Sequence, residues 1–126
     1  MNVLIDTHIL IWWLTDPDQL SRRAFNAVAD DANEVFVSAA SGYEIELKRP
    51  LDKLLQALPL DLENAVGRED FGWRPITVTH AIAAGRLPRH HRDPWDRLIV
   101  AQALQDGWPL VTADTRLEAY GAKILW

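Results

Sequence analysis

The stretch that decides the fold is residues 2–14, NVLIDTHILIWWL, where one acidic residue separates two apolar runs. Val3–Ile5 is apolar throughout rather than alternating, which is typical of a strand covered by helices on both faces. His8–Leu14 continues with helical periodicity. Asp6 therefore falls at the carboxyl end of a predicted strand, where open α/β sheets bind their ligands. A helix N-cap is the competing explanation for Asp6, because aspartate is a preferred cap.

Further strands and helices alternate outward from this stretch. The other predicted strands are Val35–Val37, Pro75–Val78, Leu110–Thr112 and, at an edge, Ala122–Leu125. The predicted helices, with their caps and their proline or glycine ends, are Ser21–Ala29, Ala39–Arg49, Asp52–Leu58, Leu60–Glu69, His80–Leu87 after a Thr79 cap, and Pro94–Gln105. This alternation predicts an α/β sandwich around a mostly parallel sheet of four to five strands, in one domain over residues 1–126.

The composition narrows the class of protein. The chain has 126 residues, 48% hydrophobic and 25% charged, which fits one compact domain. It has no cysteine, which excludes disulfides and thiolate metal sites and favours a cytoplasmic protein. The apolar N-terminal run is too short to span a bilayer and lacks the features of a signal peptide, so we expect no membrane association. The net charge of −5 argues against a generic nucleic-acid binder, but four candidate site acids supply most of it.

The four candidate site acids are Asp6, Glu44, Asp96 and Asp114. Asp6 and Asp114 follow predicted strands, and Glu44 and Asp96 lie in the first two turns of predicted helices. Because parallel strands end at a shared edge, we expect the carboxylates to converge there. Two carboxylates about 4 Å apart repel by roughly 4 kcal/mol at an effective dielectric near 20, so such a cluster points to bound cations. Oxygen-only ligands suit Mg²⁺, with Mn²⁺ able to substitute. The chemistry that needs such a site is phosphodiester hydrolysis.

For Asp96 and Asp114, a role in the site has to be weighed against a purely structural role as a helix cap or turn residue. In the segment DPWD, Asp93 is a natural N-cap with Pro94 after it, and we assign Asp93 this supporting role and Asp96 the site role. Asp114 follows the strand of Thr112 and is either a ligand or a turn residue. Thr112 either orients a water or phosphate at the site or is simply a good strand residue.

Glu44 lies in the second turn of its predicted helix and leans back toward the sheet. A capping box with Ser41 and a surface ion pair with Lys48 are the competing explanations. The apolar positions Ala40, Tyr43 and Leu47 predict the buried stripe of this helix, and Glu44 borders it. We favour the site role.

The segment Arg86–Arg97 carries four arginines together with His90 and His91. It is either a phosphate-positioning rim beside the acids or a solvated loop, and the sequence favours neither. None of the histidines has an identifiable partner, and we expect His8 to be structural. We expect the six tryptophans to be mostly buried.

Four blocks together resemble the PIN-domain ribonucleases, and more narrowly the VapC-type toxins of type II toxin–antitoxin pairs. The blocks are NVLIDTHILIWWL, VFVSAASGYEIELKRPLDKL, LPRHHRDPWDRLIVAQAL and LVTADTRLEAYGAKILW, in the order of that family. The resemblance covers nearly the whole chain. The segments DPWDRLIVAQA and VTAD are its most specific parts.

The resemblance implies a PIN-like α/β/α sandwich and a Mg²⁺- or Mn²⁺-dependent endoribonuclease that is neutralised by an antitoxin and forms a homodimer. The family's acidic quartet falls on Asp6, Glu44, Asp96 and Asp114, and its polar residue near the metal on Thr112. This chain departs from many relatives in having Tyr43 before the motif glutamate and Trp95 in place of a phenylalanine. Two other functions remain open: a housekeeping or DNA-directed nuclease with the same site, and a catalytically silent binding module.

Overall fold

The computed structural model describes residues 1–126 and contains one five-stranded sheet. The strands are β1 (Asn2–Ile5), β2 (Glu34–Ser38), β3 (Gly72–Arg74), β4 (Leu110–Val111) and β5 (Ile124–Leu125). Their order is β3-β2-β1-β4-β5, and every neighbouring pair is parallel. The prediction of a parallel α/β sheet of four to five strands is confirmed.

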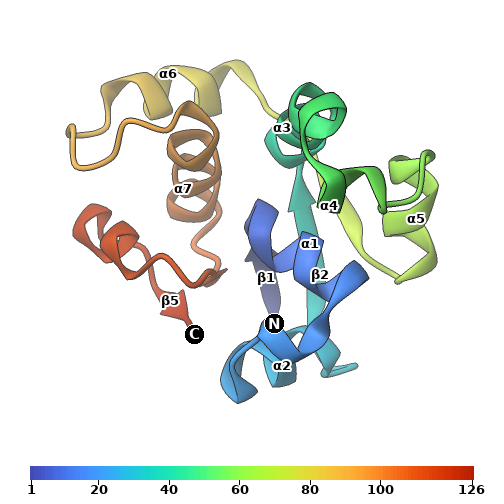
Figure 1. The fold of residues 1–126 in the computed structure, drawn as a ribbon. Helices are drawn as coiled ribbons and strands as arrows, with labels where there is room; N and C mark the ends of the chain where they lie inside the picture. Colours follow the sequence, from blue (N-terminus) through green and yellow to red (C-terminus); the bar gives the residue numbers. More distant parts are fainter.

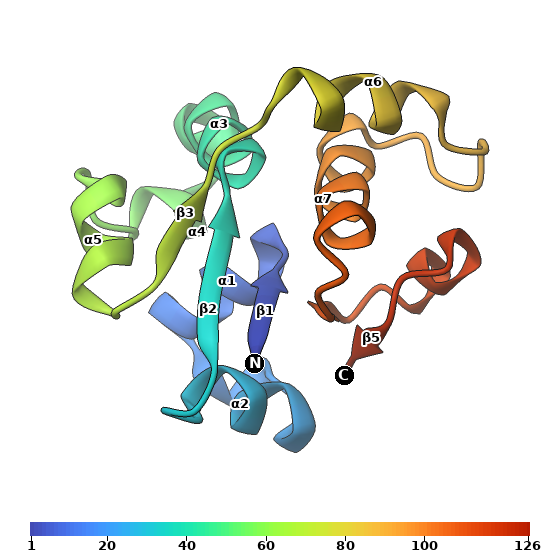
Figure 2. The same cartoon turned by 180° about the vertical axis from the view of Figure 1, so that it is seen from behind.

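Seven α-helices and three 3₁₀ turns connect the strands. They are α1 (Thr7–Thr15), η1 (Pro17–Gln19), α2 (Arg22–Ala29), α3 (Ala39–Lys48), η2 (Arg49–Leu51), α4 (Lys53–Gln56), α5 (Leu62–Arg68), α6 (Val78–Arg86), α7 (Pro94–Asp106) and η3 (Thr115–Tyr120). In Figure 1, α6 and α7 stand on the side of the C-terminal strand β5, and α4 and α5 lie on the side of β2. The view from behind in Figure 2 shows the same division, with α5 beside β3.

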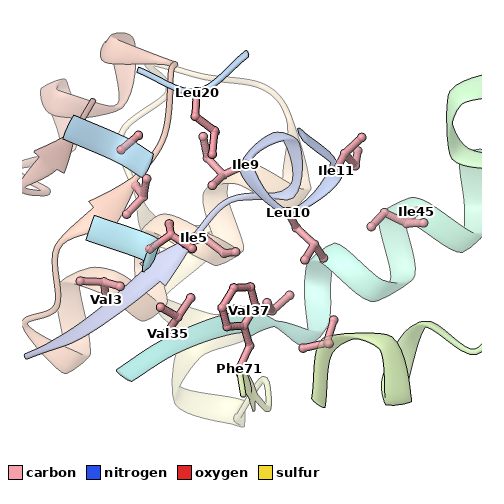
Figure 3. Packing of buried hydrophobic residues seen from close by; sticks show 14 of the residues in the cluster. Val3, Ile5, Ile9, Leu10, Ile11, Leu20, Val35, Val37, Ile45 and Phe71 are labelled. Atoms are coloured by element: carbon pink, nitrogen blue, oxygen red, sulfur yellow. The ribbon is translucent and has the colours of Figure 1, made fainter. Parts of the chain in front are cut away.

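Alternate residues of β1 point to opposite faces of the sheet and enter two separate cores. Val3 and Ile5 belong to the larger cluster, which also holds residues of α1, α2 and α5. Leu4 belongs to a smaller cluster with Ile99 and Val100 of α7. Figure 3 shows the larger core, where Val3 and Ile5 lie with Val35 and Val37 of β2 and with Ile9 and Leu10 of α1. Both faces of the central strand are covered, as its unbroken apolar sequence indicates.

The sequence prediction was wrong about the third strand. It placed a strand at Pro75–Val78, whereas β3 is Gly72–Arg74 and pairs with Phe36–Ser38 of β2. Pro75 has no N–H to donate, so it ends the strand that it was predicted to begin. Gly72 is needed in β3 because a Cβ there would lie 2.8 Å from the ring of Phe36.

Several helix boundaries also differ from prediction. Helix α6 begins at Val78 with Thr77 as its N-cap, two residues before the predicted Thr79 cap. The capping box explains the shift, because Thr77 Oγ1 accepts from the His80 N–H and His80 Nδ1 accepts from the Thr77 N–H. Helix α4 spans only Lys53–Gln56 with Asp52 as its cap, and α5 begins at Leu62 rather than Leu60. No helix has both the length and the apolar character needed to cross a membrane.

Candidate active site

Asp6 stands directly after β1 and caps α1. Its Oδ1 accepts a hydrogen bond from the Ile9 N–H at 3.0 Å. The other oxygen, Oδ2, accepts from the hydroxyl of Thr112, which follows the neighbouring strand β4. Thr112 Oγ1 in turn accepts from the Asp114 N–H at 3.0 Å. Asp6 is therefore both a helix cap and a member of a network that joins two strand ends, so the two explanations for it do not exclude each other.

Glu44 lies on the buried face of α3. It is 4% exposed, beside the buried residues Ser41 and Ile45. The predicted stripe was wrong at two positions, because Tyr43 is 61% and Leu47 54% exposed. The helix is rotated from the predicted orientation, with the carboxylate inward and these two large side chains outward.

Neither a capping box with Ser41 nor a surface ion pair with Lys48 is sufficient to explain the buried position of Glu44. The N-cap of α3 is Ser38, whose Oγ accepts from the Ala40 N–H at 3.0 Å. Ser41 instead hydrogen-bonds Thr7 of α1 at 2.9 Å, so the capping box with Glu44 is absent. The ion pair with Lys48 does exist, at 2.5 Å from Lys48 Nζ to Glu44 Oε2, but Glu44 is its buried partner.

Asp93 is the N-cap that the sequence predicted, and Asp96 has different surroundings. Asp93 caps α7, and its Oδ1 accepts from the backbone N–H of Trp95 at 2.9 Å and of Asp96 at 3.3 Å. The carboxylate of Asp96 lies one turn into the helix. Its Oδ2 is 3.3 Å from Nε2 of His91.

Asp114 caps η3 and is surrounded by basic groups. Arg116 donates two hydrogen bonds to it, from Nε to Oδ1 at 2.9 Å and from Nη2 to Oδ2 at 2.9 Å. His91 Nε2 lies 3.1 Å from Asp114 Oδ2. These contacts hold the pKa of Asp114 down at about 2, with the Arg116 hydrogen bond as the main cause.

Burial and mutual charge repulsion act together on the acids of the site. Burial raises the pKa of Asp96 to about 7, with further increases from the charges of Asp93, Asp6 and Glu44. Burial also raises the pKa of Asp6, and the charge of Glu44 adds to the increase, although the Thr112 hydrogen bond opposes it. The structure thus brings the four predicted acids to one edge of the sheet, with Asp93 beside them.

His91 is the site residue that the sequence did not identify. Its Nε2 lies between Asp96 and Asp114, and oxygen or nitrogen atoms of these three residues lie within 4.8 Å of one another. Its Nδ1 accepts from the Asp93 N–H at 3.0 Å. The only sequence signal was its place two residues before the Asp93 cap. His8, which was expected to be structural, is exposed and lies beside the Trp12 ring.

The arginine-rich segment contains a residue with a structural role. The guanidinium of Arg97 donates to the carbonyl oxygens of Ala84, Leu87 and Pro88 at 2.8–3.0 Å and to that of His91 at 3.3 Å. Arg97 therefore fixes the end of α6 and the loop that carries His91. The other three arginines of the segment, Arg86, Arg89 and Arg92, are solvent-exposed.

The donor set suits a hard divalent cation. Asp96 and Asp114 lie with His91 within 4.8 Å of one another, and Thr112 links Asp6 to Asp114 by hydrogen bonds. Asp6 and Glu44 are almost fully buried, and Asp6 and Asp96 have no lysine or arginine partner. Burial is the main cause of the raised pKa at Asp6 and Asp96, and neighbouring carboxylate charges add to it. A divalent cation bound by oxygen ligands would stabilise their ionised forms.

Comparison with known proteins shows the family of the chain. A model of the PIN domain matches residues 3–123 of the chain. The chain belongs to the PIN-domain family. Ribonuclease VapC22 of Mycobacterium tuberculosis (strain ATCC 25618 / H37Rv) is 35% identical over 120 residues, which is 94% of this chain and 92% of that protein.

Solved structures share the PIN-domain fold over almost the whole length. VapBC2 from Rickettsia felis, bound to a DNA fragment from its promoter, has a TM-score of 0.74 at 14% identity and covers 98% of this chain and 97% of the other. DNA-bound VapBC from Salmonella typhimurium has a TM-score of 0.71 at 17% identity and covers 98% of this chain and 96% of the other. FitAcB from Neisseria gonorrhoeae has a TM-score of 0.68 at 20% identity, covering 97% and 95%.

Tyr43 and Trp95, the two aromatic residues at which the family resemblance implies departures from the usual pattern, contact each other. The ring centroids of Tyr43 on α3 and Trp95 on α7 are 5.0 Å apart. Both residues therefore belong to one contact between the helices that carry Glu44 and Asp96. All six tryptophans are partly buried, and five of them pack against the two cores.

Proposed function

We propose that this chain is a Mg²⁺-dependent endoribonuclease, with Mn²⁺ able to substitute, and the toxin of a toxin–antitoxin pair. The observation that carries the proposal is the convergence of four carboxylates at the edge where parallel strands end, with Asp6 and Asp96 lacking any lysine or arginine partner. The relative that is named a ribonuclease supports the choice of RNA as substrate. The proposed catalytic and metal-binding residues are Asp6, Glu44, Asp96 and Asp114, with Thr112 and Asp93 in support.

A bound divalent cation would polarise the phosphate and stabilise the negative charge that develops during hydrolysis. The chain itself fixes the ligand atoms. Thr112 and the Ile9 N–H each bond one oxygen of Asp6, which sets the orientation of that carboxylate. Asp93 begins α7 and so fixes the position of Asp96 one turn later. Positioning of this kind fixes the ligand atoms before substrate binds, so no reorganisation is needed during the reaction.

Asp96 is the better candidate to orient the attacking water. Both oxygens of Asp6 already accept hydrogen bonds from the protein, and Asp6 is 5% exposed. The Asp96 side chain is 21% exposed, and only its Oδ2 has a close partner, at His91. Its Oδ1 remains able to accept a proton or hydrogen bond from water on the substrate side.

Purified protein with Mg²⁺ is expected to cut RNA, and Asp6→Asn or Asp96→Asn to abolish cutting. Asp31→Asn is the matched control, because Asp31 is exposed at the turn before β2. Parallel assays on DNA of the same sequence distinguish a ribonuclease from a DNA-directed enzyme. Equal cleavage by the two site variants and the wild type would refute the proposal, and absence of both Mn²⁺ binding and cleavage would favour the silent binding module.

We further propose that the partner is a cognate antitoxin and that the toxin works as a homodimer in the cytoplasm. The structural neighbours that are VapBC complexes, and one described as a toxin–antitoxin complex from Klebsiella pneumoniae, support the antitoxin. Co-expression with the product of a small adjacent gene, followed by light scattering on a sizing column, tests both points. A complex that inhibits RNA cleavage is expected, and a monomeric toxin would overturn the dimer.

A further inference from the structure

Two of the four acids of the site are already paired with a basic side chain of the same chain. Glu44 is bonded by Lys48, and Asp114 by Arg116. The other two acids, Asp6 and Asp96, form no ion pair with lysine or arginine, and Asp96 meets only the imidazole of His91. The acids of one cluster are therefore compensated in two different ways.

Arg116 holds Asp114 in a bidentate pair, with both contacts at 2.9 Å. Asp114 is the N-cap of the short turn η3 and Arg116 lies two residues later, so the pair needs no other part of the fold. The Arg116 side chain is 73% exposed, and its Nη2 is also 3.2 Å from Nε2 of His91. A guanidinium placed this way can leave the carboxylate for another oxyanion without disturbing any buried contact.

Lys48 holds Glu44 from the next turn of α3. Its Nζ is 2.5 Å from Glu44 Oε2, and its side chain is 50% exposed. Like Arg116, Lys48 combines a partner inside the site with a stem that solvent can reach.

The ion pairs leave two of the four proposed ligands open to a divalent cation. Glu44 is paired with Lys48 and Asp114 with Arg116, whereas Asp6 and Asp96 form no such pair. A second cation at Glu44 or Asp114 would have to displace a hydrogen-bonded basic group.

We propose that Lys48 and Arg116 occupy the carboxylates of Glu44 and Asp114 in the free enzyme, restrict it to one divalent cation at Asp6 and Asp96, and transfer to RNA phosphates when substrate binds. This inference rests on the proposed function and adds two positioning residues to it. Arginine binds phosphate oxygens in the same two-pronged manner as carboxylates, and lysine binds them as a point charge. Substrate arrival would thus free Glu44 and Asp114.

Calorimetric titration with Mn²⁺ in the absence of RNA tests the restriction. The wild type is expected to bind one Mn²⁺ per chain. Arg116→Gln and Lys48→Met should each tighten Mn²⁺ binding on the order of tenfold, a common size for coupling between competing ligands, and the double variant should bind a second Mn²⁺. Arg23→Gln and Lys123→Met, exposed basic residues on α2 and beside β5, are matched controls that should leave the titration unchanged.

Binding of a fluorescein-labelled single-stranded RNA in EDTA tests the transfer. Each lost phosphate contact should reduce the slope of log Kd against log salt by about 0.7, so Arg116→Gln and Lys48→Met should each show a shallower slope than either control. A merely structural role would leave this slope unchanged.

The outcomes separate this inference from the proposed function. One Mn²⁺ in the wild type and two in the double variant, with shallower salt slopes, support it. Two Mn²⁺ in the wild type, or variants that match the controls, overturn it while the ribonuclease assignment stands. No Mn²⁺ binding by the wild type would overturn the proposed function and this inference together.

Discussion

The hydroxyl of Thr112 donates a hydrogen bond to Oδ2 of Asp6, across 106 positions of sequence. The two residues meet because β1 and β4 are adjacent, with Ile5 opposite Val111. Each residue is the first after its strand, so parallel pairing brings them to the same edge. The contact ties the first and last acidic junctions of the chain into one site.

Replacing Thr112 by valine is expected to lower RNA cleavage roughly 10- to 100-fold, because residues that hydrogen-bond to metal ligands commonly contribute that much. The pKa of Asp6 should rise further, since the Thr112 hydrogen bond is what chiefly opposes the effect of burial. Thr112→Ser keeps the hydroxyl and should retain cleavage within a few-fold. Steady-state cleavage rates and Mn²⁺ affinity measure both effects, and a valine variant with wild-type values would show that the hydroxyl is dispensable.

The stability of the metal-free protein should fall as pH rises from about 4 toward 7. The pKa of Asp96 is about 7 in the folded protein and 3.8 in its ordinary, unfolded environment. Between these two pH values the folded state holds a proton that the unfolded state has lost, so raising the pH favours unfolding. Asp96→Asn should therefore be more stable than the wild type at pH 8 in EDTA, by on the order of 1–4 kcal/mol, with the difference vanishing near pH 4.

Urea unfolding across this pH range, with and without Mg²⁺, measures the effect. Mg²⁺ should stabilise the wild type at pH 8 more than Asp96→Asn, because it binds the ionised carboxylates. The exposed Asp31→Asn serves as control. A wild type that gains stability between pH 4 and 7 in EDTA would contradict this view of the site.

Arg97→Met is expected to cost about 2–3 kcal/mol of stability and to reduce cleavage. The carbonyl oxygens of Ala84, Leu87, Pro88 and His91 would lose a charged donor, and such bonds typically contribute 1.5–3 kcal/mol. Hydrogen exchange should speed up between residues 87 and 93, the loop that positions His91 and Asp93. Arg92→Met, in the same segment but exposed, is the control. Unchanged hydrogen exchange in the Arg97 variant would show that the loop keeps its conformation without the Arg97 hydrogen bonds.

Asp106→Asn should destabilise the protein by about 1–3 kcal/mol at pH 7 and leave cleavage intact. Arg74 bonds both oxygens of Asp106, at 2.7 and 2.8 Å, and joins the end of β3 to the end of α7. The Arg74 hydrogen bond lowers the pKa of Asp106 below its ordinary value of 3.8. The stabilisation by this pair is therefore fully present at pH values above 3.8, and it is lost as the pH falls through the lowered pKa.

A double-mutant cycle with Arg74→Met isolates the Asp106 pair. Urea unfolding at pH 7 and at low pH should show a coupling energy that disappears in acid. An unchanged coupling at low pH would mean that packing of Arg74 over the Trp108 ring, at 5.8 Å, provides the stabilisation instead.

The sequence alone determined the features that depend on near neighbours. Asp93 as a cap before Pro94, the helix start after Ser38 and the acids near the strand ends follow from hydrogen bonds and steric limits within a few residues. The parallel α/β sheet follows from unbroken apolar strands that alternate with helices.

The tertiary structure decided what depends on distant partners. β3 has only three residues and begins with a glycine, and its place comes from pairing with β2 and from Phe36 filling the space over Gly72. The rotation of α3 buries Glu44 instead of Tyr43 because Ser41 and Ile45 pack inward. His91 acquires its partners only when its loop meets η3. Pairings such as Thr112 with Asp6 join segments with no local preference for each other, so only the folded sheet specifies them.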